Sequence, residues 1–414
     1  MGILLLISHF GWEGYRWQVV LIYVIIVCLV SNQFFGVPIG NKMGRWTLFI
    51  FGILGILISS GLSYLIPVFS IPEISGPYHV VATHESVKNE LGYKIWFPTE
   101  QGIDITERDT YHPNPTDDLN GVMGMPGFVF SHLKLVKTNA SPAPEPIDNT
   151  VNQPLVIYSH GASSTHVDNT SLLEEIASNG FVVVAINHDF SFDKYGIDVR
   201  EAKKIEIDAQ KALIDKLIER TVPNQITHYN LTIKELERKY PSQIDFTKIA
   251  LVGHSLGGAT ASSGALEIEG VKAVVNMDGP IDKRIISDYS LPFLYLSSFS
   301  PDLPDDQLQA LGVPPEFYRG VKKYELESVE ALFQNNSNEK FWIRFKQANH
   351  LDFTDIPFMI PFMSAPHYDR QKGHELKSEV IVSFLNRALK GETEKLDYSD
   401  KTTEWIIKAT NNDG

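Results

Sequence analysis

Two long apolar stretches open the chain. No charged side chain occurs from Trp17 to Asn41 or from Trp46 to Pro72, and each stretch has about 25 residues, enough to cross a hydrocarbon layer of ~30 Å as a helix. Aromatic residues such as Trp17, Trp46 and Tyr64 are typical of the interface between lipid and water. The pattern predicts a membrane anchor over residues 1–74, with two transmembrane helices at about 17–40 and 46–70.

A cleaved signal peptide or a pair of buried core helices are the alternatives for this region. A signal peptide needs one apolar stretch, whereas two follow each other here. Lys42 and Arg45 lie between the stretches, and no lysine or arginine follows Pro72 until Lys88. The positive-inside rule therefore predicts a multi-pass membrane protein whose large C-terminal domain, residues 75–414, is extracytoplasmic.

Residues 75–414 alternate short apolar runs with amphipathic helical patterns. The runs predict strands over 93–97, 155–158, 181–186, 249–252, 271–277, 292–296 and 341–345. The patterns between them predict helices over 171–178, 199–221, 259–269 and 375–389. The first of these helices has a Ser171-x-x-Glu174 capping box and ends at Gly180. This order predicts an α/β fold with a mostly parallel sheet and crossover helices.

Composition narrows the function classes. The 414 residues are 43% hydrophobic and 21% charged, which is typical of a globular chain. The net charge of -14 excludes nucleic acid as a partner, because no basic stripe is present to neutralise phosphates. Cys28 is the only cysteine, so neither a disulfide framework nor a Cys/His zinc cluster can form. We expect no cofactor and no metal, and the oligomeric state stays open.

Gly253-His-Ser-Leu-Gly257 follows the strand predicted over 249–252 and precedes a helix rich in small residues. This is the context of a nucleophile elbow, in which a serine stands at the tip of a tight strand-to-helix turn. Ser255 is then the nucleophile, and a Cβ at either glycine would collide across the turn. The alternative is an ordinary glycine-rich turn with a surface serine.

A serine nucleophile needs a histidine base and a carboxylate that orients the histidine, in the chain order Ser, Asp, His for this fold. His350 follows the last predicted strand and is the best base, with His367 and His374 as rivals. Asp278 and Asp302 are both possible acids, although the Gly-Pro turn after Asp278 favours it.

An oxyanion hole requires two amide donors aimed at the developing negative charge. Leu256 supplies the amide directly after the nucleophile. Ala162 supplies the second, because it follows Gly161 in a loop that ends the strand predicted over 155–158. An ordinary glycine turn is the alternative for this loop.

Three motifs together are similar to a known family. Tyr158-Ser-His-Gly161, the elbow from Lys248 to Gly258 and Asn349-His-Leu-Asp-Phe-Thr-Asp355 resemble the platelet-activating factor acetylhydrolase family of serine esterases, over the region from Tyr93 to Leu389. The resemblance implies an α/β-hydrolase fold and a calcium-independent, phospholipase A2-type esterase that removes short or oxidised acyl groups from phospholipids.

The same resemblance implies specific roles. Ser255, Asp278 and His350 would form the triad, with Leu256 and Ala162 as oxyanion donors. The stretch between Asp278 and His350 is longer than usual in the family, and the soluble members lack the membrane hairpin. The chain therefore looks most like a membrane-anchored bacterial relative, for which a general carboxylic ester hydrolase activity is implied.

Two further segments combine methionine and phenylalanine with proline and glycine, namely Gly121–Phe130 and Pro357–Met363. This composition suits an adaptable acyl pocket or a surface in contact with lipid, and core packing under a loop is the alternative. We hypothesise that the second segment lines the acyl pocket, because it closely follows His350.

Other functions on the same fold stay open. A broad-specificity carboxylesterase, a thioesterase or a peptidase would use the same triad. A catalytically silent, membrane-tethered binding domain would not need it, and the complete set of site residues argues against that alternative.

Overall fold

The computed structural model describes residues 2–35, 42–88, 90–100, 107–119, 125–142, 152–188, 207–287, 289–298, 305, 315–334, 339–393 and 403–409. They form two compact units. The N-terminal unit consists of Met1–Ile71, Thr110–Thr138 and Ile356–Met363, and the sheet unit consists of Pro72–Asp109, Asn139–Asp355 and Ser364–Gly414.

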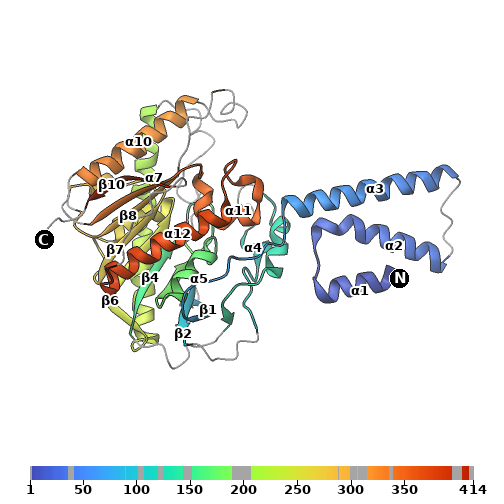
Figure 1. Ribbon diagram of the computed structural model, residues 1–414, viewed down its shortest axis with the longest axis horizontal. Coiled ribbons are helices and arrows are strands. Elements are labelled where there is room, and N and C mark those ends of the chain that lie inside the picture. The colour runs from blue at the N-terminus through green and yellow to red at the C-terminus, as the bar shows by residue number, and fades with distance from the viewer. Residues whose placement is uncertain are drawn as a thin grey trace. The chain divides into compact units, whose positions relative to one another are not determined.

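Ten strands of the sheet unit form one sheet in the order β10-β9-β8-β7-β6-β4-β5-β2-β1-β3 in the described part of the chain (Figure 1). Their bounds are β1 His79–Val87, β2 Leu91–Thr99, β3 Ser141–Pro142, β4 Gln153–Ser159, β5 Val182–Ile186, β6 Ile244–His254, β7 Val271–Met277, β8 Phe293–Ser298, β9 Lys340–Phe345 and β10 Thr403–Ala409.

The strands from β5 to β9 pair in parallel, and antiparallel strands flank them. β2 pairs antiparallel with β5 and with β1 on one side, and β10 pairs antiparallel with β9 on the other. All five residues of β5 are buried, as expected where helices cover both faces of a parallel sheet. This topology confirms the predicted α/β architecture, and each of the seven predicted strands is present.

Helices pack on both faces of this sheet (Figure 1). Alternate strand residues point to opposite faces, so that Leu155 and Ile157 join a core with α7, α8 and α10, whereas Val156 and Tyr158 join a core with α5 and α12. The bounds are α5 Thr170–Ser178, α7 Ile207–Lys239, α8 Leu256–Gly264, α10 Pro315–Gln334 and α12 Arg370–Leu385, with short turns η5 Lys283–Ile285, η6 His350–Phe353 and η8 Asn386–Lys390.

The start of α5 corrects one prediction. Gly180 ends this region with a φ of +85 as expected, but no capping box forms, and the N-cap Asn169 makes no side-chain capping bond. The Ser171 hydroxyl instead donates to Asp355, and Glu174 accepts hydrogen bonds from two backbone amides of a neighbouring segment. Partners distant in sequence therefore take the place of the local cap.

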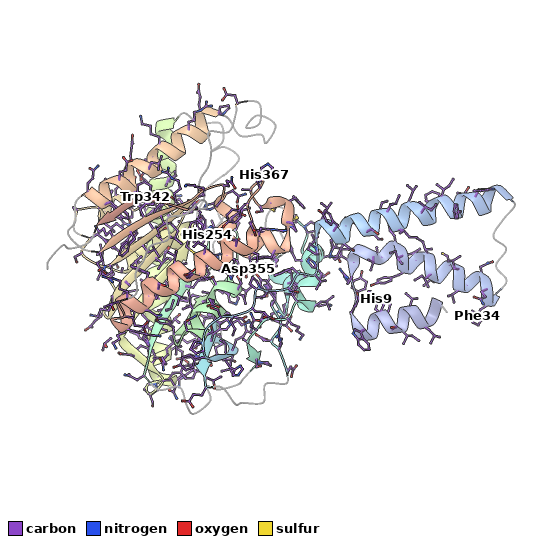
Figure 2. All side chains as sticks on the ribbon, viewed as in Figure 1. His9, Phe34, His254, Trp342, Asp355 and His367 are labelled. Atoms are coloured by element: carbon purple, nitrogen blue, oxygen red, sulfur yellow. The ribbon has the colours of Figure 1, made fainter. Side chains whose placement is uncertain are left out.

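The N-terminal unit is mainly helical. Its elements are α1 Gly2–Trp12, η1 Trp17–Val19, α2 Val20–Phe35, α3 Lys42–Leu65, α4 Pro115–Asp118, η3 Gly127–Leu135, α11 Ile356–Met359 and η7 Pro361–Met363. In the described residues one helix, Trp17–Phe34, is long and apolar enough to cross a membrane, with a mean hydropathy of 1.9, and Phe49–Leu65 is a shorter apolar helix. Figure 2 shows Phe34 on this unit.

Aromatic contacts join distant segments within the N-terminal unit. The Trp17 indole donates to the Val129 carbonyl over 2.9 Å and its ring meets Phe128 edge-on. Phe69 contacts both Tyr111 and Phe358. Residues 125–130 of the first methionine- and phenylalanine-containing segment and all of the second therefore belong to this unit, while residues 121–124 lie outside the described residues.

Candidate active site

Ser255 stands at the turn between β6 and α8 with φ 55 and ψ -125. This conformation is unfavourable for a residue with a side chain and persists only where the surrounding structure enforces it. The Ser255 amide donates to the Met277 carbonyl at the end of β7, over 2.9 Å. The serine predicted as nucleophile is thereby held at the carboxyl edge of the parallel strands.

The neighbouring glycines are required by close backbone packing. A Cβ at Gly253 would lie 2.1 Å from the Gly257 carbonyl oxygen, and one at Gly257 would lie 2.1 Å from the Ser159 carbonyl oxygen. Both distances are far below any van der Waals contact, so only glycine fits. The predicted collision at the turn agrees with this geometry.

Asp278 and His350 meet at the same edge. The His350 Nδ1 lies 2.8 Å from the Asp278 carboxylate. That carboxylate also accepts hydrogen bonds from the Ser298 amide and the Ser298 hydroxyl, each over 2.8 Å. Asp278 has a φ of 53, and its amide donates to the Leu296 carbonyl. The end of β8 therefore aims the Asp278 carboxylate at the imidazole.

Solvent access differs between the two partners. The Asp278 side chain is 5% exposed and that of His350 is 44% exposed. A buried carboxylate with three donors holds one imidazole nitrogen, while the ring remains accessible to a substrate. This is the arrangement in which a histidine can take a proton from a nucleophile and pass it on.

The two rival histidines lie elsewhere. Asp302 lies outside the described residues. His374, on α12, is buried and faces Ser171 and Ser378; burial lowers its pKa to about 3, with the charge of Lys377 acting in the same direction. His367 is exposed, on the loop that precedes α12 (Figure 2). In the described residues, only His350 among these three histidines bonds to Asp278.

The loop after β4 lies against the elbow. A Cβ at Gly161 would be 3.1 Å from the Ser255 Cβ, so this loop approaches the serine closely. Leu256 is the first residue of α8, and the amide of a first helical residue has no intrahelical acceptor. The backbone at Gly161 and at Leu256 thus borders Ser255, and Ala162, predicted as the second oxyanion donor, directly follows Gly161 in this loop.

A buried polar network supports the segment that carries His350. Asn349 and Asp352 form a capping box on η6. Asp355 accepts hydrogen bonds from the amide and hydroxyl of Ser171, and Lys377 donates to the Phe353 carbonyl. Burial lowers the pKa of Lys377 to about 8, although nearby aspartates act in the opposite direction. These contacts attach the histidine segment to α5 and α12.

Sequence reasoning missed Ser298 and His254. Ser298 donates to Asp278, and the only available signal was the pair of serines that ends β8. His254 places its ring 4.6 Å from the His350 ring, and its position next to the nucleophile was a signal that the sequence analysis did not use. Figure 2 marks His254 in the sheet unit.

Solved structures share this architecture. The ferulic acid esterase from Streptomyces cinnamoneus aligns with 82% of this chain and 99% of its own, with a TM-score of 0.58 and 18% sequence identity. Together with the mostly parallel sheet and the strand-to-helix elbow, this likeness decides the fold. The chain has the α/β-hydrolase fold.

Sequence comparisons find one family model and relatives of low identity. A family model described as Chlorophyllase matches residues 136–282. The platelet-activating factor acetylhydrolase of Cavia porcellus is 22% identical over 370 residues, which are 77% of this chain and 76% of that protein. The same enzyme of Canis lupus familiaris is 22% identical over 261 residues, 50% of this chain and 59% of that protein. These similarities support an esterase family within the fold.

Proposed function

We propose that the protein is a serine esterase that cleaves carboxylic esters through an acyl-enzyme on Ser255. The observation that carries this proposal is the 2.8 Å contact between His350 Nδ1 and the Asp278 carboxylate, at the edge where Ser255 occupies a strained elbow. In this proposal the second nitrogen of His350 takes the proton of the serine hydroxyl.

The reaction follows from these roles. The Ser255 oxygen attacks the ester carbonyl as its proton passes to His350, and the carbonyl oxygen becomes an oxyanion that the Leu256 and Ala162 amides stabilise. Collapse releases the alcohol, which takes the proton from His350. Water, deprotonated by the same histidine, then attacks the acyl-enzyme; the acid leaves as the Ser255 oxygen takes the proton back from His350. Asp278 holds the imidazole and stabilises its charge in both steps.

For the substrate, we propose a short or oxidised acyl ester, and specifically the sn-2 acyl group of phospholipids similar to platelet-activating factor. The name of the mammalian relatives supports this choice at 22% identity. The apolar N-terminal unit supports it independently, because a protein held at a lipid surface meets lipid esters at a high local concentration.

We also propose that residues 1–74 anchor the protein in a membrane with two helices and that residues 75–414 form an extracytoplasmic hydrolase domain. The apolar helix Trp17–Phe34 supports the first span, and Phe49–Leu65, although shorter, supports the second. Lys42 and Arg45 favour a cytoplasmic loop between them. A reporter fused after Gly414 should be active outside the cytoplasm, and activity confined to the cytoplasm would reverse the orientation.

A fluorophosphonate probe tests the esterase proposal on the full chain in detergent. The wild type should be labelled at one serine and should hydrolyse para-nitrophenyl esters, and Ser255→Ala should lose both properties. Ser262→Ala is a matched control, because this serine lies on α8 and donates to the Gly258 carbonyl. Labelling that persists in Ser255→Ala would contradict the assignment.

A substrate panel then separates the related functions. We expect hydrolysis of a short-chain oxidised phosphatidylcholine in vesicles and of short para-nitrophenyl esters, with much slower cleavage of a thioester or a peptide amide. Cleavage of the amide but of no ester would overturn the esterase proposal, and esters without the phospholipid would indicate a broad-specificity carboxylesterase.

A further inference from the structure

His254, the residue before the nucleophile, is a buried histidine with its own place in the site. It ends β6 and is 3% exposed. Its Nε2 lies 2.9 Å from the backbone carbonyl oxygen of His350. Because a carbonyl only accepts hydrogen bonds, Nε2 must carry the proton. The ring therefore donates directly to the backbone of the base.

The two imidazole rings also lie close together. Their centroids are 4.6 Å apart with an interplanar angle of 37°. Burial and the neighbouring His350 hold the pKa of His254 well below its usual range, so the ring is neutral at working pH. A neutral ring can lie beside His350 when that residue becomes an imidazolium, whereas a charged one would repel it.

The opposite side of the His254 ring faces the loop after β4. A Cβ at Gly161 would be 3.2 Å from the His254 Nδ1, so the loop that carries Ala162 packs on the imidazole. In the part of the chain that the structure describes, Nδ1 is buried without a hydrogen-bond partner. The His254 ring thus lies close to the Gly161 loop at Nδ1 and donates to the His350 carbonyl through Nε2.

We propose that His254 is a positioning residue, whose Nε2–H holds the His350 carbonyl so that the imidazole stays between Asp278 and Ser255 during proton transfer. This inference rests on the proposed esterase function. If His254 only packed in the core, the volume of its ring would matter and its Nε2–H group would not. The hydrogen bond therefore distinguishes the two roles.

Three substitutions of His254 separate the effect of its Nε2–H donor from the effect of its ring volume. A glutamine amide can reach the position of Nε2, whereas the shorter asparagine cannot, and phenylalanine keeps a planar ring without a donor. Because misplacement of a reacting group by about 1 Å can cost on the order of a hundredfold, we expect His254→Phe and His254→Asn to lower kcat about tenfold to a hundredfold. His254→Gln should stay within about threefold of the wild type.

The measurements are kcat and KM for a para-nitrophenyl ester with the full chain in detergent. A positioning role predicts that the loss falls on kcat with nearly constant KM and that glutamine restores it. His367→Asn is the control, because it removes an exposed imidazole outside the site. Thermal melting of each variant identifies any loss of kcat that comes from unfolding. Among the folded variants, a higher kcat for glutamine than for phenylalanine indicates that the hydrogen-bond donor is required.

Two results would overturn the inference. Equal kcat in the glutamine and phenylalanine variants, whether both high or both low, would show that the donor has no role. A loss confined to KM would place His254 in substrate binding. Failure of the esterase proposal would be recognised separately, because the wild type itself would then resist the fluorophosphonate probe.

Discussion

The carboxyl edge of the sheet and the helices α2 and α3 differ in how their side chains are solvated. At the sheet edge, buried polar groups find partners within the protein, as when Asp278 accepts from Ser298 and His350. On α2 and α3, large apolar side chains such as Leu29, Phe51 and Leu57 are 58%, 65% and 62% exposed. Nothing in the described part of the protein covers them.

The two regions therefore differ in the solvent in which their side chains are stable. Buried polar groups cost free energy unless they are hydrogen-bonded, so the sheet edge supplies its own partners and can form its geometry in water. An apolar surface on helices of this kind is stable where lipid replaces water. The sheet edge therefore fits the chemistry proposed for it, and the exposed apolar helices fit the proposed membrane anchor.

The strongest test of the sheet edge is Asp278→Asn. The amide keeps the size of the side chain and can still accept from the Ser298 amide, but it no longer stabilises a protonated His350. We expect kcat to fall about 10⁴-fold, the scale found when a triad carboxylate becomes an amide. The measurement is ester hydrolysis at neutral pH.

Asp305→Asn is a suitable control for this variant, since its carboxylate is exposed and pairs with Arg319 on the surface. A fall of less than tenfold in Asp278→Asn would mean that another carboxylate orients the base. Asp302 would then be the next residue to change.

A second prediction concerns acid stability of the sheet unit. Burial lowers the pKa of His160 to about 4 and that of His374 to about 3, whereas unfolding returns each to about 6.5. Below pH 6.5 the unfolded chain binds more protons, so stability should fall as pH falls toward 4. Each histidine contributes up to about 1.4 kcal/mol per pH unit in this window.

Asp168 and Asp352 act in the opposite direction, because burial raises the pKa of Asp168 to about 7 and also raises that of Asp352, but more histidines of this unit have a pKa lowered by burial. Urea midpoints at pH 7, 6 and 5 measure the balance. His374→Gln, which retains polar atoms near Ser171, should reduce the slope. A midpoint that is constant between pH 7 and pH 5 would refute this prediction.

The smallest expected effect probes the N-terminal unit. Phe362 is 63% exposed on the segment that follows His350 in the chain. If this residue enters the lipid interface, Phe362→Asp should lower turnover of vesicle-borne phospholipid about threefold to tenfold, because a charged group partitions poorly there, and should spare short soluble esters. Flotation with vesicles reports the lipid contact directly.

Phe358→Asp extends this test to the hypothesis that the segment lines the acyl pocket. Phe358 stacks on Phe69, with centroids 6.5 Å apart. A pocket-lining role predicts slower turnover of both soluble esters and vesicle lipids. If both variants leave both substrates unaffected, the segment has neither role.

The sequence predicted the parallel sheet and the elbow because their physical requirements are local. Buried β-branched runs form strands, and the close approach at Gly253 and Gly257 admits no side chain. The chain order of Ser255, Asp278 and His350 then followed from the fold class. The assignment of their roles rests on geometry and stays a proposal until the variants are measured.

Other features depend on contacts that no local pattern contains. The capping box at Ser171 was wrong because Asp355, 184 residues away, binds the same hydroxyl. His254 was missed for a similar reason, since its partner is a backbone carbonyl 96 residues away. The second apolar helix, α3, spans Lys42–Leu65 instead of about 46–70, because hydropathy does not determine where a helix begins or ends.

The backbone at Ser255 and Asp278 limits how far this protein can be made heat-resistant. Both residues have positive φ, 55 and 53, and each such conformation costs on the order of 1–3 kcal/mol in a residue with a side chain. Glycine would relieve the cost at either position and would remove the reactive group with it. Selection for thermal tolerance that keeps the proposed site must therefore act elsewhere in the chain.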